Sequence, residues 1–353
     1  MRSIRRRVDV LHSRPGEDRG MSSIEDATVA PVSPSALSSE VPARGVEYHR
    51  LALLRPRPRW WKPLLTGLLG IAFYLAILVL VIVPLVIVAA LVPEWGAELQ
   101  MLFRTTAYFQ LDRPWLLVAL VLPLILMIPA LLLASRVVQG RGVGLLSSVA
   151  GRLRMDWLGR TLGLAFAVFV VYFAVVLGWS AALGDAVTPD FSHPGLLLMV
   201  VLLLVLIPFQ AAAEEYVFRG YLMQLVGTWL RHPAFAILLP VPLFVLGHGY
   251  DIWGAASVGL FAVVAAWLTW RTGGLEAAIA LHIVNNLMIF LLGSVAVVDA
   301  NATSGTPVDL LGSAAAMLVF AVVADRWARR RGITRTASAV ARGTHLLPPR
   351  MHG

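Results

Sequence analysis

The chain has 353 residues, of which 58% are hydrophobic and 14% charged, whereas an average soluble domain has roughly 45–50% apolar and 25% charged residues. This composition argues against a soluble enzyme, and the absence of cysteine excludes disulfides and thiolate metal sites. The formal net charge is +9, but the basic residues flank apolar segments, so they indicate membrane topology rather than nucleic-acid binding.

The first 63 residues contain no apolar stretch long enough for a signal peptide or a membrane span. They carry twelve basic and seven acidic residues and are rich in serine and proline. We therefore predict that residues 1–63 form a disordered, basic cytoplasmic arm, within which Met21 offers an alternative translation start.

Eight apolar runs separated by short polar connections follow this arm, each near the ~20 residues that span a bilayer. Because helices satisfy their backbone hydrogen bonds internally, we predict an all-α bundle of about eight transmembrane helices over residues 64–325. Residues 326–353 are expected to form a basic cytoplasmic tail. The runs are 64–92, 115–135, 161–183, 195–222, 233–252, 254–271, 275–298 and 308–325.

The charges of the connections alternate as eight crossings require, because cytoplasmic loops collect arginine and lysine. The connections after the second, fourth, sixth and eighth runs are basic, and the others carry more acidic residues. We therefore predict that both termini are cytoplasmic. Arginine supplies 28 of the 29 basic residues. With abundant alanine and glycine, this bias is typical of GC-rich bacterial genomes, so we expect a bacterial plasma membrane.

Ionisable side chains cost roughly 2.5–3.5 kcal/mol at the centre of a bilayer, so those within the apolar runs are candidate functional residues. The fourth run ends with Glu214, Glu215 and Arg219. Glu215 and Arg219 are four residues apart and share a helix face in the favourable acid-first order. Glu214 is rotated by about 100° from Glu215. We therefore predict a Glu215–Arg219 pair and an unpaired Glu214.

Two further runs each carry an imidazole. Phe244 and His248 in the fifth run are four residues apart, as are His282 and Asn286 in the seventh. A carboxylate, two imidazoles and a carboxamide are the groups needed to hydrolyse an amide with activated water. A general base contributes ~10²–10⁴ in rate, and an oxyanion donor contributes ~10²–10³. The chain has no serine-nucleophile, zinc-helix or phosphate-loop motif.

The three motifs are Glu-Glu-x-x-x-Arg at 214–219, Phe-x-x-x-His at 244–248 and His-x-x-x-Asn at 282–286, in this order on separate runs. With them the chain resembles the CPBP family, the CAAX protease and bacteriocin-processing intramembrane endopeptidases, which includes the type II CAAX prenyl endopeptidases. The CPBP-like core covers about residues 195–298. The resemblance implies an intramembrane endopeptidase that hydrolyses peptide bonds of a membrane-associated protein or peptide.

The resemblance also implies a role for each motif residue. Glu214 and His248 would activate the attacking water, and His282 and Asn286 would form the oxyanion hole. The supporting residues would be Glu215, Arg219 and Phe244. Whether the substrate is prenylated does not follow from these motifs.

Three alternatives to a metal-free protease remain at this point. Glu214, His248 and His282 would make a two-histidine, one-carboxylate zinc site with an open water position, although we favour a mechanism without a cofactor. Buried glutamate and histidine also build the proton relays of transporters. A non-catalytic membrane scaffold or bacteriocin-immunity type protein would keep the same fold.

One geometric expectation concerns depth in the membrane. His282 lies about seven residues, or roughly 10 Å, into its helix. For Glu214 to reach the same depth, the fourth helix must continue to about Leu222. We therefore predict a water-filled cavity that opens toward the cytoplasm, with the lipid bilayer and the substrate as the partners of the protein.

Overall fold

The computed structural model describes residues 45–140, 142–184 and 187–338, and nearly all of its regular structure is helical, which confirms the all-α expectation. The predictions for residues 1–44 and 339–353 lie outside the described residues. The long helices are α1 (Lys62–Leu91), α3 (Pro114–Gln139), α4 (Met155–Ala182), α5 (Leu196–Glu215), α9 (Ile252–Thr272), α10 (Glu276–Ser294) and α11 (Pro307–Arg330). The short elements are β1 (Val46–Glu47), η2 (Tyr48–Leu54), α2 (Pro93–Leu102), η3 (Val143–Leu146), η4 (Tyr216–Leu222), α6 (Met223–Trp229), α7 (Pro233–Leu238), α8 (Val241–Leu246) and β2 (Thr336–Ala337).

Seven helical segments of the described chain are long and apolar enough to cross a membrane. One of them runs without a break from Leu196 to Trp229 through α5, η4 and α6. The fifth predicted run, 233–252, does not form a long helix, and here the expectation needs correction. It forms α7 and α8, which are interrupted at Pro240 because proline lacks the N–H that a continuous helix would use.

The α7–α8 segment still connects opposite ends of the bundle, as contacts between the loops show. One group of loops, here called the basic end, comprises residues 45–61, 142–154, 230–232, 273–275 and 331–338. It is joined by the strand pair Val46–Ala337 and by hydrogen bonds of Tyr48 with Leu146, His49 with Arg231 and Val149 with Gly273.

The other group, the acidic end, comprises residues 103–113, 187–195, 247–251 and 295–306. It is joined by backbone hydrogen bonds of Asp190 with Val295 and Asp251 with Thr303, both 3.0 Å, and by the Asn301 side chain with Phe109. The segment between Arg231 and Asp251 therefore begins at the basic end and finishes at the acidic end. Together with the seven long segments it makes eight passages between the two ends.

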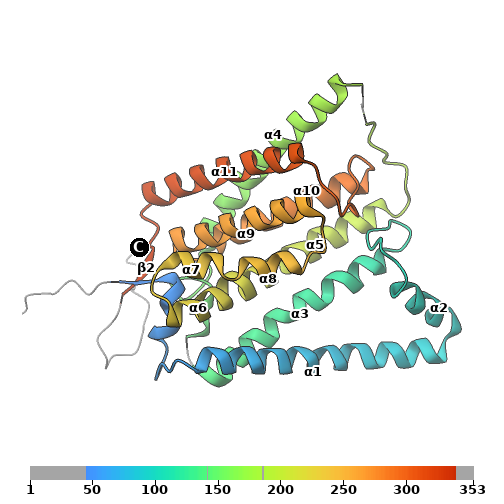
Figure 1. The fold of residues 1–353 in the computed structure, drawn as a ribbon. Coiled ribbons are helices and arrows are strands. Elements are labelled where there is room, and N and C mark those ends of the chain that lie inside the picture. Colours follow the sequence, from blue (N-terminus) through green and yellow to red (C-terminus); the bar gives the residue numbers. More distant parts are fainter. Residues whose placement is uncertain (1–44, 141, 185–186, 339–353) are drawn as a thin grey trace, which may run out of the picture. The chain divides into compact units, whose positions relative to one another are not determined.

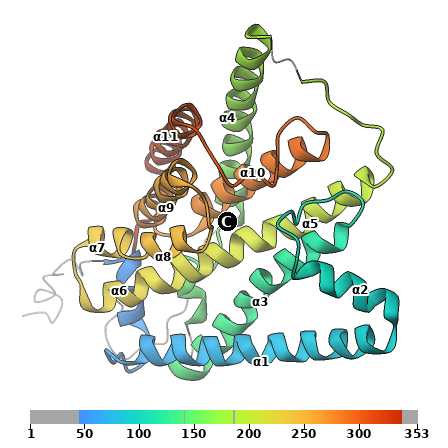
Figure 2. The same ribbon diagram turned by 45° about the vertical axis from the view of Figure 1, so that its right-hand side comes forward.

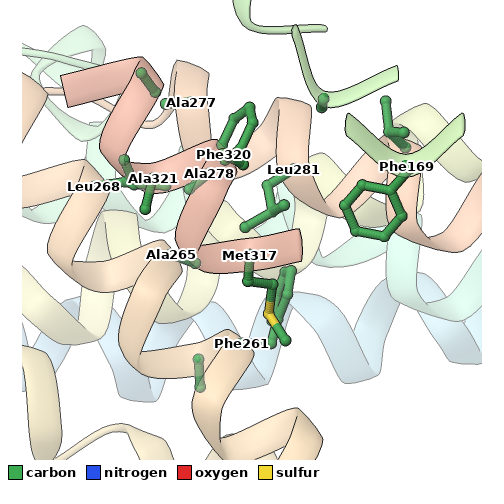
Figure 3. Close-up of a cluster of buried hydrophobic side chains, with 14 of the residues drawn as sticks. Phe169, Phe261, Ala265, Leu268, Ala277, Ala278, Leu281, Met317, Phe320 and Ala321 are labelled. Carbon is green, nitrogen blue, oxygen red and sulfur yellow. The ribbon is translucent and has the colours of Figure 1, made fainter. Parts of the chain in front are cut away.

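Helix α10 is the most buried of the seven spans, with half of its apolar window inside the protein. It packs against α4, α5 and α9, while α3 packs between α1 and α5 (Figures 1 and 2). Apolar side chains of α4, α9, α10 and α11 form a hydrophobic core between these helices. It includes Phe169, Phe261, Leu281, Met317 and Phe320 (Figure 3). This packing fixes the positions of the polar residues on α5 and α10.

Structured residues extend further toward both termini than we predicted. Tyr48 and Leu51 of η2 are fully buried, so the described part of the predicted disordered arm is folded. At the other end α11 continues to Arg330 and β2 pairs with β1. The η2 sequence contains apolar side chains and is followed by arginine and proline, so it is a poor helix former by itself. Burial of its apolar side chains against α6 offsets this and stabilises η2.

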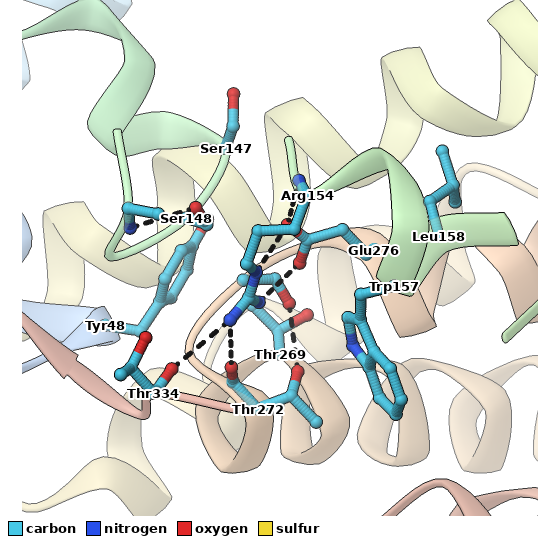
Figure 4. A network of polar contacts seen from close by, with 12 residues as sticks. Tyr48, Ser147, Ser148, Arg154, Trp157, Leu158, Thr269, Thr272, Glu276 and Thr334 are labelled. Atoms are coloured by element: carbon cyan, nitrogen blue, oxygen red, sulfur yellow. Dashed lines mark hydrogen bonds and ion pairs between the residues drawn. The ribbon is translucent and has the colours of Figure 1, made fainter. Parts of the chain in front are cut away.

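A buried ion pair ties the loops of the basic end together. Arg154 at the start of α4 makes two contacts with the fully buried Glu276 carboxylate, at 2.8 and 2.6 Å, and donates to the carbonyl oxygens of Thr272 and Thr334 (Figure 4). Glu276 lies in the first turn of α10, where its carboxylate meets the positive end of the helix dipole. The Arg154 side chain thus joins the start of α4 to the end of α9, the start of α10 and the segment before β2.

Candidate functional site

The acidic pair lies where the helix changes its winding. Glu214 and Glu215 are the last residues of α5, and η4, which follows directly, is a π-helix. The prediction that this helix continues past Glu214 to about Leu222 is confirmed, and the helix in fact reaches Trp229. π-Helical turns are rare and occur mostly at functional sites, which draws attention to these carboxylates.

Glu215 is the centre of a buried polar cluster. Its Oε1 accepts hydrogen bonds from Arg219 Nη1 at 2.9 Å and from His282 Nδ1 at 2.8 Å. None of the three residues is more than 3% exposed. The predicted Glu215–Arg219 pair is therefore confirmed, and it includes His282 from α10 as a third member.

Glu214 has partners of its own, which corrects the expectation that it is unpaired. Its Oε1 accepts a hydrogen bond from Gln210 Nε2 one helical turn earlier, and its Oε2 lies 3.8 Å from His282 Nε2. Because His282 Nδ1 donates to Glu215, the opposite nitrogen of the ring is the one that faces Glu214. His282 thus lies between the two carboxylates.

Gln210 is a member of the cluster that the sequence analysis missed. Its amide oxygen accepts a hydrogen bond from Asn286 Nδ2 at 3.1 Å, so it connects Glu214 on α5 with Asn286 on α10. The signal was present in the sequence, because a glutamine four residues before Glu214 in an apolar run shares its helix face.

Aromatic rings enclose the charged cluster on the side of α8 and α9. Arg219 lies over the Phe244 ring at 4.4 Å from its centroid, a cation–π geometry, and Phe261 packs edge-on against His282 at 4.9 Å between centroids. The sequence indicated Phe244, but nothing in the pattern of α9 distinguished Phe261 from other core residues. These rings exclude water from the cluster and so strengthen its electrostatic interactions.

His248 stands apart from the other predicted residues. Its Nδ1 donates to the Phe244 carbonyl oxygen at 2.7 Å, and its ring lies 4.7 Å from the Phe244 ring. Among the contacts of the described residues, none joins His248 directly to Glu214 or His282. His248 is half-buried, and its Nε2 remains available to a water molecule or substrate.

The zinc alternative required Glu214, His248 and His282 to converge. Within residues 45–338, apart from the undescribed positions, no three His, Cys, Asp or Glu side chains are arranged to hold a metal ion. Glu214 and His282 supply two donors, whereas the contacts of the His248 ring are with Phe244 and Tyr250. The donor set as arranged does not fit a three-ligand zinc site, so we derive no step through a metal.

A small cavity, with room for about one water molecule, lies beside the cluster, between η4, α7, α8 and α9. Arg219 and Phe244 form part of its wall, and the remaining lining is apolar: Phe218, Ala236, Ile237, Pro240, Val241, Ala262 and Ala266. This lining suits an apolar group better than water, so the cavity is not the water-filled one that the sequence predicted.

Comparisons with known proteins concern this same region. Residues 194–288 match the family model of Rce1-like type II CAAX prenyl endopeptidases, and this stretch includes every residue of the cluster. A similar protein is the uncharacterized YyaK of Bacillus subtilis (strain 168), 26% identical over 149 residues, or 38% of this chain and 48% of YyaK. The chain thus aligns with about half the length of this relative. No solved structure matches the chain.

Proposed function

We propose that the chain, whose residues 194–288 match the family model of Rce1-like type II CAAX prenyl endopeptidases, is an intramembrane endopeptidase. The observation that supports the proposal most strongly is the buried cluster of Glu214, Glu215 and His282 on two long apolar helices. Such a cluster is costly in a membrane protein and adds nothing to helix packing that apolar residues would not supply. Its proposed substrate is a membrane-associated protein or peptide.

We assign Glu214 the role of general base. Gln210 holds one of its carboxylate oxygens, and the other oxygen faces the space beside His282. Glu214 takes one proton from a water molecule while the water oxygen attacks the carbonyl carbon of the scissile peptide bond. Because the Nδ1–H of His248 is donated to the Phe244 carbonyl oxygen, Nε2 is the ring nitrogen left to hydrogen-bond to this water, and it would orient the water.

The attack turns the carbonyl oxygen into an oxyanion, which needs hydrogen-bond donors. Asn286 has a second N–H besides the one used by Gln210, and His282 offers Nε2–H when both of its ring nitrogens carry protons. The C–N bond then breaks, and Glu214 returns the proton to the leaving amine. Glu215 and Arg219 act through His282. Glu215 accepts a hydrogen bond from the His282 ring and so fixes its orientation, and Arg219 holds the Glu215 carboxylate in place.

We propose that the basic end faces the cytoplasm, which places both termini there, and that the membrane is a bacterial plasma membrane. The basic end carries the excess of arginine that cytoplasmic loops collect. The cavity beside Arg219 opens among residues nearer this end and would receive an apolar group of the substrate.

The test compares the protein termini of membrane and secreted fractions from cells that express wild type, Glu214→Gln or His248→Ala. Glu214→Gln preserves the size of the side chain but removes the base. The matched control is Asp156→Asn, which changes an exposed carboxylate of α4 in the same way. We expect termini that are present in wild type and in the control but absent from both site variants, at equal membrane levels of the four proteins.

Identical termini in all four strains would overturn the protease assignment and favour a scaffold. Cleavage that is retained by wild type in detergent after treatment with a strong chelator supports the metal-free mechanism. Cleavage that stops with the chelator and returns with zinc would instead establish the metal-dependent form.

A further inference from the structure

A second cavity lies at the basic end, far along the chain from the residues of the proposed active site. It has about 260 Å³ of empty volume and opens between the end of η2, the turn that follows, and the ends of α1, α3 and α6. Figures 1 and 2 show the start of α1 next to the end of α3 at this place. Its lining includes three cations, Arg55, Arg59 and Lys62, together with Gln139 and Thr228, and no acidic residue.

The positive charge of this cavity has no counter-charge in the described protein. Arg55 is only 3% exposed, and its guanidinium donates to the Ser135 hydroxyl at 2.5 Å, but its buried Nε has no partner. Burial lowers the pKa of Arg55 to about 10, so the side chain still carries its charge at neutral pH. Within the described ranges, no ion pair involves Arg55, Arg59 or Lys62.

A buried arginine without a carboxylate is unfavourable, because a charge removed from water must be paired and hydrogen-bonded. Elsewhere at the basic end the protein supplies such partners. Arg154 has Glu276 and Arg335 has Glu47. The unpaired cations of the second cavity therefore indicate that an anion from outside the chain completes it.

The surroundings of the cavity place it at the level of lipid headgroups. Trp60 and Trp61, which are 66% and 38% exposed, directly precede α1, and Trp229 donates to the Trp60 carbonyl oxygen. Tryptophan is enriched where the hydrocarbon of the bilayer meets water. From Leu64 onward, α1 exposes leucine, isoleucine and valine along its length, as a lipid-facing helix does.

We propose that this cavity binds the phosphodiester headgroup of an anionic phospholipid from the leaflet at the basic end. The phosphate oxygens accept from the side chains of Arg59 and Lys62, the buried Arg55 adds a third positive charge behind them, and the acyl chains lie along α1. The enclosed part of this space has room for only about one water molecule, so the headgroup lies in its open mouth, beside the exposed Arg59 and the half-buried Lys62. Basic pockets between membrane helices recognise lipid headgroups by this chemistry.

The test measures lipid binding by the purified full-length protein in a neutral detergent. Dioctanoyl-phosphatidylglycerol is titrated into wild type, Arg59→Gln and Lys62→Gln, and the apparent Kd is obtained from thermal stabilisation. Both substituted side chains reach solvent, so the variants should fold. The matched control is Arg57→Gln, which removes one charge from the same turn but does not line the cavity.

We expect each lining variant to weaken binding about fivefold, as the loss of one cation near a phosphate predicts, and Arg57→Gln to leave it unchanged. Equal weakening in all three variants, or stabilisation of wild type by dioctanoyl-phosphatidylcholine to the same degree, would overturn the site. Equal stabilisation by inorganic phosphate at the same concentration would overturn the lipid assignment in favour of a free phosphate. None of these outcomes depends on proteolysis.

Discussion

At the scale of single residues, the site is defined by how Glu214 and Glu215 differ. They are neighbours in sequence, but the helix directs Glu215 to Arg219 and His282 and directs Glu214 to Gln210. The Glu215 carboxylate is therefore neutralised by a cation, while the Glu214 carboxylate keeps an oxygen available beside an imidazole. This division supports the assignment of catalysis to Glu214 and of orientation to Glu215.

Gln210 tests this division, because it touches Glu214 and Asn286 without being a base itself. Gln210→Ala should lower kcat about tenfold and leave KM within twofold, since the carboxylate loses its orientation but substrate contacts persist. The measurement is the rate of cleavage of the substrate found through its termini, with purified protein at matched folded fractions. A change confined to KM would assign Gln210 to substrate binding instead.

Two acid–base pairs with the same four-residue spacing differ in burial, and this difference predicts their contribution to stability. Glu215–Arg219 is buried, whereas Asp156–Arg160 on α4 is largely exposed. Arg219→Met should lower the free energy of unfolding by about 3–5 kcal/mol, because it leaves a buried carboxylate without its cation. Arg160→Met should change it by less than about 1 kcal/mol.

Thermal unfolding in detergent, followed by intrinsic tryptophan fluorescence, measures both variants. The chain has 11 tryptophans, which give a sufficient signal. Similar stability of the two variants would show that the buried pair is replaceable by apolar packing, and the cluster would then owe its presence to function alone.

At the scale of elements, the sequence predicts long helices well and interrupted ones poorly. Apolar length identifies α1, α3 and α4, because burial in lipid requires only hydrophobic side chains. Pro240 is visible in the sequence, but prolines also lie inside α1, α3 and α5 without ending these helices, and hydropathy does not describe the π-helical turn after Glu215. The motif residues were found because they are polar in an apolar context, whereas Phe261 was missed because it resembles the core around it.

Close contact between α6 and η2 gives an element-scale prediction. A β-carbon on Gly227 would lie 1.8 Å from the backbone oxygen of His49, and backbone has no room to move there. Gly227→Ala should therefore destabilise the protein by about 1–3 kcal/mol, as overpacking does.

Gly163 in α4 is the matched control, because a β-carbon there meets nothing within 4 Å. Gly163→Ala should be neutral or stabilise the protein by up to about 1 kcal/mol through its helix propensity. Thermal unfolding of both variants distinguishes the two effects, and equal shifts would contradict the close packing of η2 on α6.

At the scale of the whole molecule, the loops sort into two ends by contact as well as by charge. The basic end is held by Arg154 and Glu276 and by the pairing of β1 with β2, which lie near opposite ends of the chain. An even number of passages follows, because Val46 and Ala337 are paired at the same end. Seven long segments alone would separate them, so the α7–α8 segment must complete the crossing.

A crossing by the α7–α8 segment determines from which side single cysteines can be labelled, and the sequence has no cysteine that would add background. Arg231→Cys lies before α7, Tyr250→Cys follows α8, and Arg330→Cys at the end of α11 serves as the control for the basic end. A membrane-impermeant maleimide should label Tyr250→Cys in intact cells and should label the other two only in inverted vesicles. Labelling of Arg231→Cys and Tyr250→Cys from one side would mean that the segment returns to the end at which it began, and the site would then be built around a re-entrant hairpin.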